Sequence, residues 1–256
     1  MANANVICMK WGRMFGSEYI NRLYRGVRRH ISGDLRFICV TDDRDGIRTE
    51  VEIIDYAPGS FEAALAEAVR KSPRKGPLQK VLMQKPGLVP DLNGPLLALD
   101  IDVVITGPLQ ELFAYAPGKI CMRRTWAAPS RWSGIGHGSA CRFDPTLHGY
   151  LYDDIARDTE ACVLAANGSE QSYVSWSAHD HGDLAFFPDE WCASFKYDCR
   201  PPRPLNLILR PRLPANARLV FFHGRPKMVE AVAGYWPDPL HATRPAPWLT
   251  EAWRDE

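Results

Sequence analysis

Two aspartates, Asp100 and Asp102, interrupt an otherwise apolar segment that runs from residue 96 to residue 105. On a β-strand, side chains two residues apart point to the same face, so the two carboxylates would lie side by side. Buried carboxylates repel each other and are costly to remove from water, and a divalent cation bound by both would remove that penalty. Carboxylate oxygens suit hard ions, so the pattern predicts a Mn²⁺ or Mg²⁺ site. The alternative is that the strand ends near residue 100 and both acids are solvated turn residues. The apolar run resumes at once at Val103, which favours the metal site.

The segments before this pair predict the elements that position it. Residues 6–9, 37–40 and 51–54 are expected to form buried strands, and residues 17–31, 60–70 and 78–85 helices. The segment 96–105 is apolar on both faces apart from its aspartates, as a strand in the middle of a covered sheet is. This alternation is typical of an α/β, Rossmann-like fold with a mostly parallel central sheet and helices on both faces. Ligands of such sheets bind at the carboxyl ends of the strands, so the residues after strands 6–9 and 37–40 should share one crevice with the acidic pair.

The second half of the chain is less regular. A glycine-containing loop is expected at 130–138, helices at 144–157 and 169–176, and strands at 184–187 and 219–222. Residues 200–216 are rich in proline and arginine and predict an extended connector. We interpret residues 1–236 as a single domain and residues 237–256 as a tail, containing proline and tryptophan, that wraps the surface.

Composition excludes several classes of protein. Of the 256 residues, 46% are hydrophobic and 24% are charged, which excludes general disorder. The formal net charge of +1 argues against nucleic acid as a partner. None of the seven cysteines forms a C-x-x-C pair, so reduced core thiols are expected. No apolar run is long enough for a transmembrane segment and no signal-peptide pattern stands at the start, so we expect a cytoplasmic protein. Arginines on the helix at 17–31 leave peripheral membrane contact open.

Residues 97–107 (LALDIDVVITG) resemble the D-x-D strand of GT-A glycosyltransferases, which use nucleotide-diphosphate sugars. The resemblance is closest to the retaining branch that includes glycogenin and the bacterial lipopolysaccharide sugar transferases. Further features fall in the order expected for that branch. They are Lys10-Trp11-Gly12 after the first strand, the acidic end of 37–43 (FICVTDD), Lys80, Glu170-Gln171 and 221–227 (FFHGRPK).

The resemblance implies roles for particular residues. Asp100, Asp102 and His223 would bind the metal, with Asp100 also touching the ribose of the donor. Lys227 would contact the leaving diphosphate, where negative charge develops. The other donor-binding residues implied are Lys10, Trp11, Tyr19, Asp42, Asp43, Lys80 and Gly224. Glu170 and Gln171 would face the donor sugar or the acceptor, and residues 130–139 would line the acceptor side.

Each of these residues also has a structural interpretation. His223 could be a strand-end histidine satisfied by backbone groups, and Tyr19 a packing residue on its helix. Asp42 and Asp43 could be turn residues, as short acidic side chains often are. Lys80 could be solvated, and Glu170 could be an acidic residue favoured in a first helical turn.

The sequence therefore predicts a metal-dependent glycosyltransferase of the hexosyltransferase type. It would move a sugar from a nucleotide-diphosphate sugar, with UDP as the expected nucleotide, to a glycan, lipid-linked or protein acceptor with retention. One alternative is a sugar-phosphate nucleotidyltransferase, although residues 10–16 fit its glycine-rich phosphate loop poorly. The other is a non-catalytic nucleotide-sugar-binding module. It stays open because His223 and Gly224 are adjacent here, whereas glycogenin-type motifs separate them, and because the usual Asn-Ser is missing near 135–139.

Overall fold

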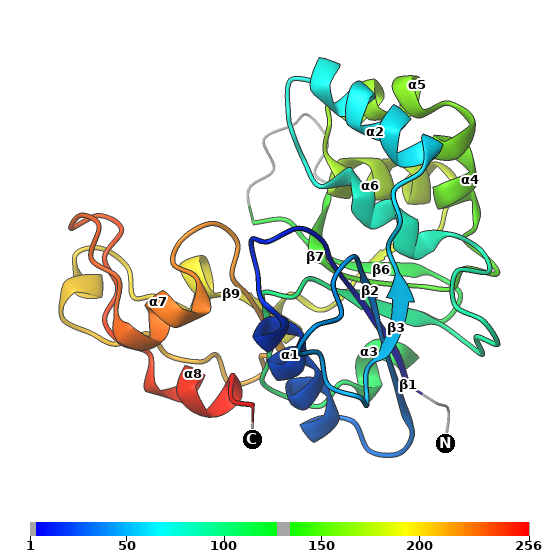
Figure 1. Cartoon of the computed structure of the whole chain (residues 1–256). Helices are drawn as coiled ribbons and strands as arrows, with labels where there is room; N and C mark the ends of the chain where they lie inside the picture. The colour runs from blue at the N-terminus through cyan, green and yellow to red at the C-terminus, as the bar shows by residue number, and fades with distance from the viewer. Residues whose placement is uncertain (1–3, 127–133, 256) are drawn as a thin grey trace.

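A computed structural model describes residues 4–126 and 134–255 of the chain (Figure 1). Within them, a seven-stranded sheet has the order β3-β2-β1-β4-β7-β6-β8. Its strands are β1 (Ala4–Lys10), β2 (Leu35–Thr41), β3 (Glu52–Asp55), β4 (Leu96–Leu99), β6 (Ile120–Arg124), β7 (Gly136–Phe143) and β8 (Leu184–Phe186). All pairings are parallel except those of β7 with β4 and β6. The prediction of an α/β fold with a mostly parallel sheet is confirmed.

Helices cover both faces of this sheet, as the alternating side chains of β1 require. Val6 and Cys8 pack into one buried cluster with α1 (Ser17–Arg29) and α3 (Gln110–Ala114). Ile7 and Met9 point the other way, into a second cluster. That cluster is completed by α2 (Ser60–Lys71), η1 (Leu78–Gln84), α4 (Tyr150–Arg157), α5 (Thr159–Ala165) and α6 (Glu170–Asp180). Burial of both faces explains why β1 and β4 read as continuous apolar runs.

A second, three-stranded sheet holds β5 (Val103–Ile105), β10 (Leu219–Phe221) and β9 (Cys192–Ser194). Its own buried cluster contains Met228 of α7 (Met228–Ala233) and Leu249 of α8 (Pro247–Ala252). Short elements η2 (Asp189–Trp191), η3 (Phe195–Cys199) and η4 (Leu205–Leu207) flank this sheet. Trp253 is only 6% exposed, so the end of the chain is part of a core and does not merely wrap the surface.

The prediction of one continuous strand over 96–105 is wrong. The chain leaves the first sheet after Leu99 and enters the second at Val103. It changes sheets because β4 pairs with β1 and β7, whereas β5 pairs with β10. Asp100 and Asp102 stand in the turn between the sheets, so the argument from a shared strand face does not hold. The turn is nevertheless largely shielded from solvent, because the side chains of Asp100 and Asp102 are only 27% and 16% exposed.

Other boundaries also differ from the predictions. Residues 136–138 begin β7 instead of lying in a loop, and the helix expected from residue 144 starts at residue 150. The element expected at 78–85 is a 3₁₀ helix, and η4 interrupts the predicted connector. Residues 130–133 of the predicted loop lie outside the described residues. The cysteines form no disulfide, and all but Cys162 are buried. In the described ranges, no helix has the length and apolarity that a membrane span requires.

Candidate active site

Two cavities meet at the carboxyl ends of β1 and β4. The one we call the β1 cavity has a volume of about 330 Å³ and the β7 cavity one of about 280 Å³. Both are lined by Pro77, Lys80 and Asp100, which therefore stand at their junction. The β1 cavity is completed by Met9, Lys10, Trp11, Met14, Phe15, Ile101, Asp102 and Lys227. The β7 cavity is completed by Arg74, Gly76, His137, Gly138, Ser139, Gly168, Ser169, Glu170 and Gln171.

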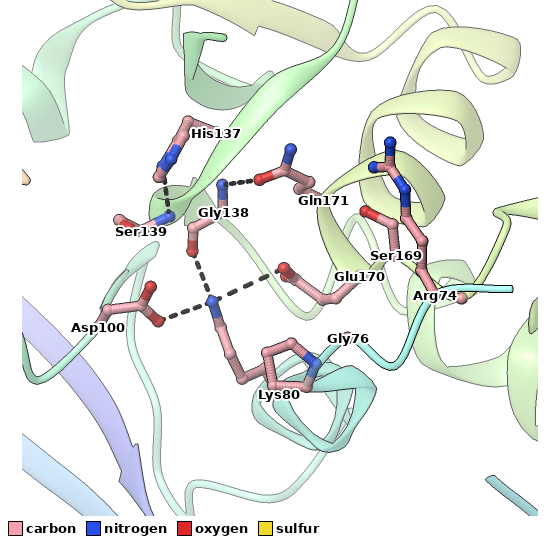
Figure 2. A pocket seen from close by; sticks show the side chains of 12 residues that line it. Arg74, Gly76, Lys80, Asp100, His137, Gly138, Ser139, Ser169, Glu170 and Gln171 are labelled. Atoms are coloured by element: carbon pink, nitrogen blue, oxygen red, sulfur yellow. Dashed lines mark hydrogen bonds and ion pairs between the residues drawn. The ribbon is translucent and has the colours of Figure 1, made fainter. Parts of the chain in front are cut away.

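Lys80 joins the two cavities electrostatically, as Figure 2 shows. Its Nζ lies 2.7 Å from Asp100 Oδ1 and 3.6 Å from Glu170 Oε2, and it donates a 2.7 Å hydrogen bond to Gly138 O. Burial alone would lower the pKa of Lys80, but the charges of Asp100 and Glu170 raise it above its ordinary value. Lys80 is thus a buried, charged ammonium group between two carboxylates, not a solvated helix lysine.

Lys227 makes the corresponding contact with the second aspartate. Its Nζ lies 2.6 Å from Asp102 Oδ2 and also donates to Phe222 O at 3.3 Å. Even so, burial and the charge of Asp100 raise the pKa of Asp102. Burial likewise raises the pKa of Glu170. Three carboxylates therefore face two ammonium groups, and at Asp102 and Glu170 burial outweighs the nearby positive charge.

The aspartate pair suits a cation that takes its other ligands from a substrate. Asp100 and Asp102 each use one oxygen for a lysine, and within the described chain Asp100 Oδ2 and Asp102 Oδ1 have no hydrogen-bond partner. The raised pKa of Asp102 also shows that further positive charge would stabilise the pair. Mg²⁺-like ions are commonly held by one or two carboxylates together with substrate phosphates. Among the residues described, no three His, Cys, Asp or Glu side chains are grouped to hold an ion by themselves.

His223 is not gathered with the aspartates in this arrangement. Its Nε2 lies 2.8 Å from Ser194 Oγ, and its ring packs on Trp126 and Tyr197, with ring centres 5.5 Å from each. The ring of His137 is 5.1 Å away. Burial lowers the pKa of His223, and burial together with His223 lowers that of His137 to about 4. Both imidazoles are neutral at pH 7, the form in which histidine binds metals or accepts hydrogen bonds.

The start of α6 and the start of β7 are fitted closely together. Ser169 Oγ caps α6 by accepting from Ser172 N, and Gln171 Oε1 accepts from Gly138 N at 3.3 Å. A Cβ atom on Gly138 would lie 2.5 Å from Glu170 Oε2. The lack of a side chain at Gly138 therefore lets Glu170 and Gln171 reach the edge of the β7 cavity.

The predicted donor-binding residues after the first two strands separate into two groups. Lys10 and Trp11 line the β1 cavity, and Lys10 is only 4% exposed, with Nζ 3.5 Å from Asp43 Oδ2. Asp42 instead accepts from Gly12 N, at 2.9 Å to Oδ2, and so fixes the loop after β1. Tyr19 lines neither cavity.

Two further predicted residues have local roles that the structure defines. The ring of Tyr19 packs against Phe15 and Trp253, with centres 4.7 Å and 5.4 Å away. Gly224, directly after His223, has a φ of +78°, a conformation that glycine adopts without strain. It is absent from the linings of both cavities.

Sequence reasoning did not single out Arg74, Met14 or Phe15, and it mentioned His137 and Ser139 only as part of a loop. The signal for β7 was hidden by three glycines, which favour the prediction of a loop. Arg74 lies in a proline-containing segment between two predicted helices, and no sequence pattern there indicates that its side chain lines a cavity.

Comparison with solved structures identifies the fold. No family model matches the sequence, and no curated protein sequence matches it. The galactosyltransferase LgtC, solved with donor and acceptor sugar analogs, superimposes with a TM-score of 0.61 at 11% identity, covering 97% of this chain and 94% of LgtC. Mouse xyloside xylosyltransferase 1 matches with a TM-score of 0.55 at 10% identity, over 87% of this chain and 98% of that one.

A third match is the glycosyltransferase GlyE of Streptococcus pneumoniae TIGR4, with a TM-score of 0.56 at 14% identity. It covers 88% of this chain and 56% of GlyE. The chain therefore has the GT-A glycosyltransferase fold, as the D-x-D resemblance implied.

Proposed function

We propose that this protein is a glycosyltransferase that uses a nucleotide-diphosphate sugar. The observation that carries the proposal is the position of Asp100, in the turn after β4, where the β1 and β7 cavities meet. In an open α/β sheet, substrates bind in the crevice at the carboxyl ends of the strands. A donor with two chemically different halves suits a crevice with two compartments and an acidic junction.

We assign the nucleotide to the β1 cavity and the transferred sugar to the β7 cavity. Trp11, Met14 and Phe15 give the β1 cavity apolar surfaces against which a base can pack. The β7 cavity is lined by groups that bind hydroxyls, among them Ser139, Glu170 and Gln171. The diphosphate would then lie at the junction, beside the ammonium group of Lys227. UDP is the nucleotide that we expect, by analogy with the D-x-D branch.

A divalent cation, Mn²⁺ or Mg²⁺, would be held by the carboxylates of Asp100 and Asp102. When bound, such an ion neutralises negative charge on a leaving diphosphate. Lys227 would act on the same charge, because its Nζ lies 2.6 Å from Asp102 Oδ2 and the residue lines the β1 cavity. Lys80 holds Asp100 from the other side and keeps its carboxylate directed to the junction.

Transfer with retention agrees with the arrangement of Glu170. A general base for an inverting reaction must be free to take the proton of the acceptor. Glu170 instead lies 3.6 Å from the Lys80 ammonium, and its side chain is only 7% exposed. We therefore assign Glu170 and Gln171 to binding the sugar and stabilising positive charge on it. The acceptor proton would pass to the leaving phosphate. A product with inverted anomeric configuration would contradict this part.

Thermal unfolding with a panel of UDP- and GDP-sugars, with and without Mn²⁺, tests the proposal. A ligand that binds only the folded state stabilises it by about 2.7 kcal/mol at a hundredfold excess over Kd. We expect a manganese-dependent rise in Tm for one donor and its loss in Asp102→Asn. Binding without hydrolysis or transfer would instead indicate a non-catalytic binding module. Release of pyrophosphate from a nucleoside triphosphate and a sugar phosphate would indicate a nucleotidyltransferase. The acceptor and the cytoplasmic location stay predictions.

A further inference from the structure

Two neighbouring loops of the C-terminal part expose large apolar side chains among arginines. The first is residues 200–214, where Leu205, Ile208 and Leu209 are 45%, 73% and 44% exposed. The second is residues 234–244, where Trp236 and Leu240 are 54% and 56% exposed. These loops form the left edge of the molecule in Figure 1, in gold and orange-red. We call the exposed side chains of both loops the loop surface.

Hydrogen bonds hold the two loops together, so the loop surface has a defined structure. Asn206 is fully buried and its Nδ2 donates to Pro239 O and Ala242 O, at 3.1 Å and 2.9 Å. Arg203 Nε donates to Leu240 O at 2.7 Å. The first loop also contains five prolines, which restrict its backbone. The aliphatic side chains at its tip are therefore held outward and are not free to fold back onto the domain.

The charge of the loop surface is strongly positive although the whole chain is nearly neutral. Residues 200–214 contain four arginines and no acidic residue. Arg210 and Arg212 are exposed, and in the described part of the chain their side chains have no hydrogen bond or ion pair. The one acidic residue of the second loop, Asp238, already has a partner, because its Oδ2 lies 2.8 Å from Nδ1 of His241. The surface thus combines unpaired cations with exposed leucine, isoleucine and tryptophan.

This combination excludes two other partners on physical grounds. A second copy of the chain, docked about a two-fold axis, would bring the arginine-rich loops face to face, and like charges across an interface are unfavourable. A nucleic acid would satisfy the arginines and could stack on Trp236, but it would leave the exposed leucine and isoleucine side chains in water. Apolar side chains with arginines around them are typical of segments that lie in the interface of an anionic bilayer.

We propose that the loop surface docks the protein onto an anionic lipid bilayer, with Ile208 and Leu209 entering the interface and Arg203, Arg210 and Arg212 contacting the headgroups. The surface is distinct from the arginines of α1, where the sequence left membrane contact open.

The docking surface lies next to the candidate site along the chain. The segment η3 leads directly into Arg200, and the ring of its Tyr197 is centred 5.5 Å from that of His223. The ring of His223 is in turn centred 5.1 Å from that of His137, which lines the β7 cavity. If the proposed transfer function holds, on which this one step rests, an acceptor carried by the bilayer would approach from the side of the β7 cavity.

Vesicle flotation with the full chain tests the docking without any need for activity. The probes are vesicles of phosphatidylcholine alone and vesicles in which about one-third of the lipid is phosphatidylglycerol. We expect binding to the anionic vesicles, and a loss of at least about tenfold in partitioning for the double variant I208D/L209D. R210Q/R212Q should lose about fivefold for each arginine on anionic vesicles only.

The matched control is L147D/L164D. It also replaces two exposed aliphatic residues, 60% and 45% exposed, by two acids, but lies far along the chain from both loops. It should bind within about twofold of the unchanged protein, since only its net charge differs. An equal loss of vesicle binding in I208D/L209D and L147D/L164D would overturn the proposal. So would a failure of the unchanged protein to bind anionic vesicles. So would a dimer in solution that I208D/L209D dissociates without any lipid binding. Donor-induced stabilisation in I208D/L209D separates a failure of docking from a failure of the proposed function.

Discussion

Replacing Lys80 by methionine should destabilise the protein and make its stability depend on pH. The change removes the ammonium group that lies between Asp100 and Glu170 but keeps most of the buried volume. Removing one partner of a buried ion pair costs about 3–5 kcal/mol. Because Asp100 is 27% exposed and can be partly solvated, we expect the lower end, about 3 kcal/mol at pH 7.

The direction of the pH dependence follows from Glu170. Burial already raises its pKa, and without Lys80 the pKa would rise further. A folded-state pKa above the unfolded value means that the folded chain holds a proton that the unfolded chain has released. The free energy of unfolding of K80M should therefore increase as the pH falls from about 7 toward 5, relative to the unchanged protein.

Urea unfolding at both pH values measures these effects, and the double variant K80M/E170Q is the control. Glutamine cannot ionise, so the double variant should recover at least about half of the lost stability at pH 7 and lose the added pH dependence. A loss below about 1 kcal/mol in K80M, or no recovery in the double variant, would refute the assignment of Lys80 as the counter-charge of Glu170.

Two further substitutions test the β7 cavity. Gly138→Ala would place a methyl group 2.5 Å from Glu170 Oε2, so we expect a loss of about 1–3 kcal/mol in urea unfolding and weaker donor binding. An unchanged midpoint would mean that the Glu170 side chain is not held there. His137→Gln should reduce acid sensitivity, because a pKa of about 4 in the folded state against about 6.5 in the unfolded chain destabilises the fold by up to about 3 kcal/mol as the pH falls from about 6.5 to 4. Equal slopes of stability against pH in H137Q and the unchanged protein would contradict the burial of a neutral imidazole.

Much of the fold could be predicted because its central strands are buried on both faces. Such strands appear as apolar runs, as residues 6–9 and 37–40 do, and their alternation with helices defines the parallel sheet. Asp100, Asp102, Lys80, Glu170, Gln171 and Lys227 line the two cavities. The roles that the resemblance implies for them stay predictions.

The features that could not be predicted depend on tertiary contacts, such as the strand with which a segment pairs. Hydropathy does not distinguish a long strand from two short strands in different sheets, so the break between Leu99 and Val103 was hidden. The glycines at the start of β7 serve close contact with Met122 and Glu170, which only the packed structure reveals. The resemblance also grouped His223 with the aspartates, whereas its nearest polar partner is Ser194 on β9.

The crossing between the sheets has a consequence for how the acidic motif is interpreted in relatives. Val103 and Ile105 pack in the cluster around α1, whereas Val104 packs against α7 and α8. An insertion or deletion between Asp100 and Val103 that shifted β5 by one residue would turn each of these side chains toward the wrong layer. The length of the motif is thus constrained by the architecture of the protein as well as by chemistry. Packing alone therefore favours this spacing, so the length of the acidic turn is by itself no measure of activity.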